Sequence, residues 1–112
     1  MDNNLKLWLY NILNAILEIE NFFDDQSKDF AKYQTDLRMK RAVKRNMGII
    51  GETLNKVLQA DQTLKISHSE EIAEIRNRII AYDSVSDEMI WEIITKRFPV
   101  LKAEIESLLR DK

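Results

Sequence analysis

Residues 5–23, LKLWLYNILNAILEIENFF, decide the fold of this chain, because their apolar side chains recur at steps of three and four. That spacing is the period of one face of an α-helix. It predicts a helix from about Asn4 to Phe23. Its buried stripe should consist of Leu5, Trp8, Leu9, Ile12, Leu13, Ile16, Ile19 and Phe23.

A second long helix is predicted after a polar interruption at residues 24–27. Thr35 or Asp36 can cap it, because a short side-chain oxygen accepts a hydrogen bond from the free first-turn amides. The helix should end before Asp61. Its core stripe should be Val43, Met47, Ile50, Leu54 and Val57, and a short amphipathic extension should precede it at Phe30 and Tyr33.

Two further helices begin at serines. Ser67, followed three residues later by Glu70, fits a capping box, and Ser86 is followed by two acids that suit the positive end of a helix. The first of these helices should bury Ile72, Ile75, Ile79 and Ile80. The second should bury Ile90, Trp91, Ile94, Phe98, Leu101, Ile105 and Leu108.

Pro99 lies inside the last stripe, where it should kink or divide the helix because it lacks an amide proton and crowds the preceding turn. Four or five helices with short connections predict an all-α, up-and-down bundle. At 112 residues the chain is long enough for one core, so residues 1–112 are expected to form a single domain.

Composition excludes several classes of site. The chain has no cysteine and one histidine, which rules out disulfides, thiol nucleophiles and histidine-rich metal sites. We therefore expect no metal and no cofactor. No apolar run approaches the ~18 residues of a membrane span, and no basic-then-apolar leader is present, so a cytoplasmic protein is expected. The net charge of −2 means that any contact with nucleic acid must come from a local basic patch.

The segment from Arg76 to Asp83, RNRIIAYD, carries the clearest functional signal. It resembles the active-site motif of the HEPN superfamily, in its HepT-like branch, in which Arg and usually Asn are followed by His after four to six residues and often by a Tyr two places further. Arg76, Asn77 and Tyr82 match this motif. No histidine stands between Ile80 and Tyr82.

Three other stretches resemble the same family in the same order. They are residues 41–54 with their Gly51–Glu52 pair, residues 83–91, and the proline-containing residues 98–101. The resemblance implies a homodimeric ribonuclease toxin that needs no metal. In that family Arg stabilises the charge on the phosphoryl oxygens, and His transfers a proton during the attack of the ribose 2′-hydroxyl on phosphorus. It also implies a partner nucleotidyltransferase antitoxin that silences the toxin by adenylating a tyrosine, here Tyr82.

The missing histidine has no obvious replacement. His68 precedes Arg76 by eight residues, ~12 Å along one helix, which is too far to serve the same site. Its simpler interpretation is an exposed residue of the first turn. Tyr82 and Asp83 are the nearby proton carriers, but their ordinary pKa values of ~10 and ~3.9 suit proton transfer at neutral pH poorly.

Each residue of the motif also has a structural interpretation. Arg76 falls on the apolar stripe of its helix, so it either lies at the stripe's edge paired with an acid such as Glu52 or points at phosphate across a wet cleft between protomers. Asn77 can orient Arg76, donate to phosphate or be a plain polar residue, and Tyr82 can be an ordinary core or interface aromatic. Glu52 can equally be a solvated glutamate. Gly48 and Gly51, three residues apart, are interpreted as sites of close helix packing.

Five cations fall within residues 38–45 with no acid among them. Arg38, Arg41 and Arg45 share one helix face and form a candidate track for an RNA backbone, although a solvated face or a surface for an acidic partner fits equally well. We therefore hypothesise a HepT-like toxin that cleaves RNA weakly because its histidine is absent. The alternative is a catalytically silent HEPN module that binds its partners without cutting RNA.

Overall fold

A computed structural model describes residues 3–23, 29–67, 69–81 and 85–110, without the side chains of Ile75, Ile79, Ile80 and Ala81. These residues form six α-helices and one π-helical segment. They are α1 (Asn3–Phe22), α2 (Phe30–Thr35), α3 (Leu37–Ala60), α4 (Ser69–Ala81), α5 (Asp87–Glu92), the π segment Ile93–Arg97, and α6 (Phe98–Arg110).

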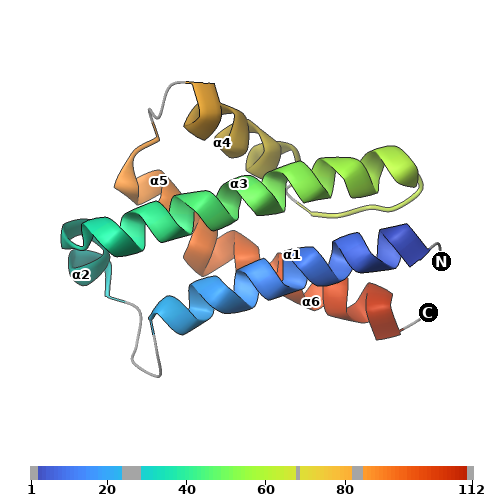
Figure 1. Cartoon of the computed structure of the whole chain (residues 1–112), viewed down its shortest axis with the longest axis horizontal. Coiled ribbons are helices and arrows are strands. Elements are labelled where there is room, and N and C mark those ends of the chain that lie inside the picture. The colour runs from blue at the N-terminus through green and yellow to red at the C-terminus, as the bar shows by residue number, and fades with distance from the viewer. Residues whose placement is uncertain (1–2, 24–28, 68, 82–84, 111–112) are drawn as a thin grey trace.

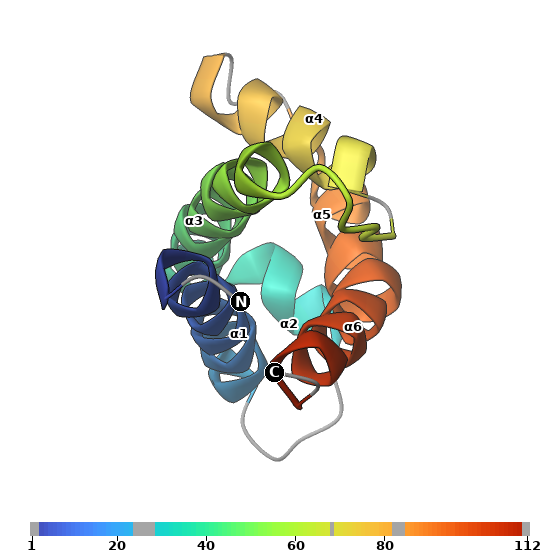
Figure 2. The ribbon, with the colours of Figure 1, turned by 90° about the vertical axis from the view of Figure 1, so that its right-hand side faces the viewer.

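The helices form an up-and-down bundle, as the sequence predicted. α1 and α3 run antiparallel, α4 packs on α3, and α5 continues through the π segment into α6, which returns along α1 (Figure 1). Seen end-on, α4 lies on the opposite side of α3 from α1 (Figure 2). Among the described residues there is no strand, so the all-α prediction is confirmed. None of the helices in this part of the chain is both long and apolar enough to cross a membrane.

The core is built from the predicted stripes. All five members of the α3 stripe are buried, and α1 buries Leu5, Leu9, Ile12, Ile16 and Ile19, while Trp8 and Leu13 are partly buried. From α4, Ile72 is buried; the predictions for Ile75, Ile79 and Ile80 fall outside the described side chains. The last stripe buries Ile90, Ile94, Phe98, Leu101 and Ile105, with Trp91 and Leu108 partly buried.

Two of the predicted caps are confirmed and one is corrected. Asp36 accepts a hydrogen bond from the Met39 amide at the start of α3, and Ser86 accepts one from the Met89 amide at the start of α5. The capping box at Ser67 was wrong. The Ser67 amide and hydroxyl both donate to the Glu104 carboxylate, at 3.1 and 2.8 Å, because this segment lies against α6.

Pro99 divides the last helix, as predicted. The amide of Phe98 donates to the carbonyl of Ile93, five residues back, which is a π-helical bond. Proline at 99 provides no amide proton and its ring would crowd the carbonyl of residue 95, so the wider turn before it relieves that crowding. The hydroxyl of Thr95 donates to the Trp91 carbonyl at 2.8 Å across this turn.

An aromatic cluster fixes α2 against the rest of the bundle. Tyr33 is fully buried, and its ring lies 5.5 Å from that of Trp91, which also contacts Phe23 and Phe30. Burial, followed by the charge of Asp87, raises the pKa of the Tyr33 hydroxyl, which therefore stays neutral at physiological pH. This end of α3 is held to α5 by an ion pair of 3.0 Å between Lys40 and Asp87.

Candidate functional site

Arg76 lies at the contact between α4 and α3, where Gly51 makes room for it. A Cβ atom at position 51 would come within 2.6 Å of the Arg76 Cβ and 2.8 Å of its Cγ, closer than side-chain atoms ever pack. The stem of Arg76 therefore rests on bare helix backbone. The predicted close packing is confirmed at Gly51. It was wrong at Gly48, where a Cβ would meet nothing within 4 Å, because that position faces away from the neighbouring helices.

The guanidinium of Arg76 is held by one firm contact and one weak contact. Its Nη1 donates to the side-chain oxygen of Asn77 at 2.9 Å, and its Nη2 lies 3.9 Å from a Glu52 carboxylate oxygen. The Glu52 side chain is 58% exposed and that of Arg76 is 30% exposed, so solvent screens this pair and it adds little stability. Packing over Gly51 and the bond to Asn77 are what position the cation.

The Nε of Arg76 is buried and, among the described residues, has no hydrogen-bond partner. A buried donor without a partner costs free energy, and such an atom calls for an explanation in the function of a protein. The Tyr33 hydroxyl is a second buried atom of this kind, and the Arg76 Nε is closed to solvent, so an anion could reach only the exposed part of the guanidinium. The planar fork of Arg donates two parallel bonds to phosphate, so this arrangement suits a phosphate group better than it suits the distant Glu52 carboxylate.

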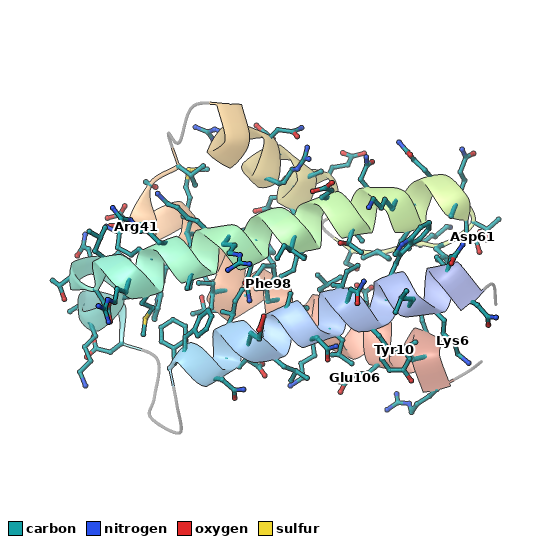
Figure 3. All side chains as sticks on the ribbon, in the orientation of Figure 1. Lys6, Tyr10, Arg41, Asp61, Phe98 and Glu106 are labelled. Carbon is teal, nitrogen blue, oxygen red and sulfur yellow. The ribbon has the colours of Figure 1, made fainter. Side chains whose placement is uncertain are left out.

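The basic track, Arg38, Arg41 and Arg45, is exposed on α3. Figure 3 shows Arg41 at the N-terminal end of this helix. The track and Glu52 recur at steps of three and four with Gly48 between them, so they share one helix face. Arg45 is seven residues from Glu52, ~10 Å along the helix, and Arg38 is fourteen residues away, ~21 Å. The track therefore leads toward Arg76 without being part of its immediate surroundings.

Two other cations, one on α3 and one on α4, have structural roles. Lys40, one of the five cations of the predicted basic run, pairs with Asp87 and also donates to the carbonyl of Gln34 at 3.4 Å. The Nη1 of Arg78 lies 3.9 Å from the sulfur of Met89 on α5. Sequence spacing could not separate these residues from functional cations, since their partners lie far along the chain.

The remaining predicted residues are only partly placed. Asn77 is exposed beside Arg76 on α4. His68, Tyr82 and Asp83 lie outside the described residues, so their predicted roles stay predictions. α4 ends at Ala81, which puts the position expected for the family's histidine in its last turn. The site described here therefore consists of Gly51 and Glu52 from α3 and of Arg76 and Asn77 from α4.

Comparison with known proteins decides the family. The family model "Ribonuclease HepT-like" matches residues 12–108, which include every residue of this site. The chain belongs to the HepT-like ribonuclease family. The predicted resemblance to the family is thereby confirmed, while the match of Arg76 and Asn77 to its active-site motif stays a prediction.

Relatives of this HepT-like protein occur in Methanocaldococcus jannaschii. One, named "Putative RNase MJ0125", is 31% identical over 96% of this chain and 93% of its own length. A second, "Putative RNase MJ0127", is 29% identical over 96% of this chain and 89% of its own. The third, "Gamma-glutamylcyclotransferase and putative RNase MJ0434", is 32% identical over 99% of this chain, which spans 50% of that longer protein. No solved structure gave a significant match.

Proposed function

We propose that this HepT-like protein is an RNA endonuclease toxin that acts as a homodimer, needs no metal ion, and is controlled by a minimal nucleotidyltransferase antitoxin. The observation that carries the proposal is the position of Arg76. Its stem is fixed on Gly51, its guanidinium is oriented by Asn77, and its side chain is 30% exposed with only a weak contact of 3.9 Å to Glu52. Family membership and the RNase names of the relatives support RNA as the substrate.

In the proposed reaction the ribose 2′-hydroxyl attacks the adjacent phosphorus. The bond from phosphorus to the 5′-oxygen breaks, which leaves a cyclic phosphate on one fragment and a hydroxyl on the other. Arg76 stabilises the charge that develops on the phosphoryl oxygens, and Asn77 keeps its fork in place. The proton transfers lack the family's histidine, so we expect slow cleavage, with Tyr82, Asp83 or water as the proton carrier.

The test of this function is cleavage by the unaltered chain. Purified protein incubated with single-stranded RNA in excess EDTA should produce fragments with cyclic phosphate ends, slowly, and expression without the antitoxin should slow growth. Fragments that disappear in EDTA but return with a divalent ion would contradict the metal-independent reaction. If folded protein binds RNA and yields no fragment, the alternative function holds, namely a silent HEPN module, which the absent histidine favours.

The basic track is proposed to guide the RNA backbone toward Arg76. Replacing Arg38, Arg41 and Arg45 together by Ala should weaken RNA binding and flatten the dependence of log affinity on log salt by about 0.7 per lost phosphate contact. Fluorescence anisotropy at several salt concentrations measures both effects. A matched triple replacement of the exposed Lys56, Lys65 and Lys96 removes the same charge elsewhere. Equal losses from the two triple variants would show that net charge, rather than a track, attracts RNA.

The homodimer is proposed to bring two Arg76 sites together across facing α4 helices, so that one phosphate lies between two cations. Asn77 is exposed on this helix, and the chain has no cysteine of its own. An Asn77→Cys variant under mild oxidation should therefore form a covalent dimer.

In the same proposal the antitoxin adenylates Tyr82. Mass spectrometry after coexpression with a nucleotidyltransferase should then find one added adenylate, which Tyr82→Phe abolishes.

A further inference from the structure

One stripe on the outer side of α1 carries no charged residue, in a chain of which 32% of the residues are charged; Lys6 and the exposed Glu18 border it. We define the α1 face as Leu7, Tyr10, Asn14, Leu17 and Asn21, which recur at steps of three and four along the helix. Leu7 is 56%, Tyr10 47% and Leu17 37% exposed. A helix face that only meets water normally carries charged side chains, so this uncharged face with three large apolar residues indicates a contact surface.

A groove of about 280 Å³ lies beside this face, between α1 and α6. Tyr10, Leu13 and Leu109 supply its apolar walls, while Glu106 and Arg110 supply charges of opposite sign. Figure 3 shows Tyr10 and Glu106 where α1 and α6 lie against each other. The surface thus offers both a ridge, made by the α1 face, and an adjoining groove with one negative and one positive side chain.

The register of α1 and α6 places the middle of the α1 face at the same height as the midpoint between Glu106 and Arg110. Lys102 of α6 pairs with Glu20 of α1 at 3.1 Å, and the helices run antiparallel (Figure 1). Six residues back along α1 from Glu20 is Asn14, and six residues forward along α6 from Lys102 is Leu108. Because the rise per residue is the same in both helices, Asn14 and Leu108 lie at one level. Leu108 is midway between Glu106 and Arg110, and Asn14 is midway between Leu7 and Asn21.

We propose that a second copy of this chain binds here, around a twofold axis that passes near Asn14 and Leu108. Such an axis places Glu106 of each copy against Arg110 of the other, so both charges of the rim find opposite partners. It also places the α1 face of each copy antiparallel against the α1 face of the other, with Asn14 near Asn14 and Leu7 opposite Asn21. Asn14, the α1 residue nearest the axis, is uncharged. This suits the symmetry, because a charged residue there would lie against the same charge of the second copy.

This contact is separate from the Arg76 site. α1 and α6 lie on the side of the bundle away from α4 (Figure 2), so both surfaces can be occupied at once. Pairing through α4 together with pairing through the α1 face then builds assemblies larger than a dimer. Neither contact requires the other, and the two can be tested independently.

Charge exchange tests the reciprocal pairing. Glu106→Arg leaves two cations at the rim and Arg110→Glu leaves two anions, so each variant alone should associate at least about tenfold more weakly than the unaltered protein. An equimolar mixture of the two variants should associate again, because the cationic rim of one then meets the anionic rim of the other. Light scattering should show the mass of the mixture exceeding that of either variant at the same total concentration. An ion pair between residues 106 and 110 of the same chain cannot produce this result, because each variant carries two charges of the same sign at these positions.

A single cysteine at the proposed axis provides a second test. Asn14→Cys should form a covalent dimer under mild oxidation, since its two copies would lie within disulfide reach. Gln62→Cys, exposed in the turn after α3, is the matched control and should remain monomeric on a denaturing gel. The proposal is overturned if the mixed charge variants stay at the mass of the separate variants, or if Asn14→Cys crosslinks no faster than Gln62→Cys.

Discussion

Inserting a histidine between Ile80 and Ala81 is expected to raise RNA cleavage by about a hundredfold or more, the usual contribution of a positioned general base. The insertion produces Arg, four residues, His, Ala and Tyr, which is the spacing of the HepT-like motif. α4 ends at Ala81, so the added residue falls in its last turn, where fraying can absorb it without rotating the buried Ile72. Cleavage should require no metal, and expression of the variant should become toxic.

The matched control for this insertion is an alanine at the same place, which changes the register equally but brings no imidazole. Only the histidine insertion should gain activity, and adding Arg76→Ala should remove the gain, because both side chains act on the same transition state. If the alanine insertion gains as much, the change in register is responsible. If the folded histidine variant cleaves nothing, the site lacks more than its histidine, and the silent-module function replaces the toxin function.

Gly51→Ala is expected to displace Arg76 and lower RNA affinity by about tenfold or more, together with the stability of the fold. The added Cβ would lie 2.6 Å from the Arg76 Cβ, which is fixed to the α4 backbone and cannot swing aside. α4 must therefore move away from α3. Such overpacking costs about 1–3 kcal/mol, against a gain of about 1 kcal/mol from replacing glycine by alanine in a helix. Thermal unfolding and RNA-binding anisotropy measure the two losses.

Gly48→Ala is the matched control on the same helix. Its Cβ would meet nothing within 4 Å, so the substitution causes no overpacking. Because alanine has a higher helix propensity than glycine, the protein should become more stable by up to about 1 kcal/mol. RNA affinity should stay close to that of the unaltered chain. If Gly51→Ala stabilises the protein as Gly48→Ala does and binds RNA normally, Gly51 does not hold Arg76 in place.

Much of the fold could be predicted because it depends on local signals. The stripes of α1 and α3 fix which faces are buried, and Asp36 and Ser86 mark helix starts by their own hydrogen bonds. The error at Ser67 arose because its partner, Glu104, lies 37 residues away in the chain. A local motif contains no information about such a partner.

The candidate site was less predictable. The Arg76–Asn77 pair and the possible partner Glu52 were identified from the sequence, but the reason for Gly51 beside Glu52 was visible only once α4 lay on α3. Similarly, the spacing of residues 38–45 could not show that Lys40 would pair with Asp87. In both cases the missing information was a contact between helices that are distant in sequence.

The most direct test of the account is the affinity of Arg76→Ala for a single-stranded RNA made uncleavable by 2′-O-methylation. Arg78→Ala, two residues along the same helix, removes an identical charge and serves as the control. If Arg76 binds phosphate, its loss should weaken binding by about tenfold or more, as expected for a charge-assisted hydrogen bond, and should lower the melting temperature little. Arg78→Ala should then bind RNA almost normally. Equal affinities for the two variants, or a large loss of stability with unchanged binding in Arg76→Ala, would contradict the assignment of Arg76 as the phosphate-binding residue.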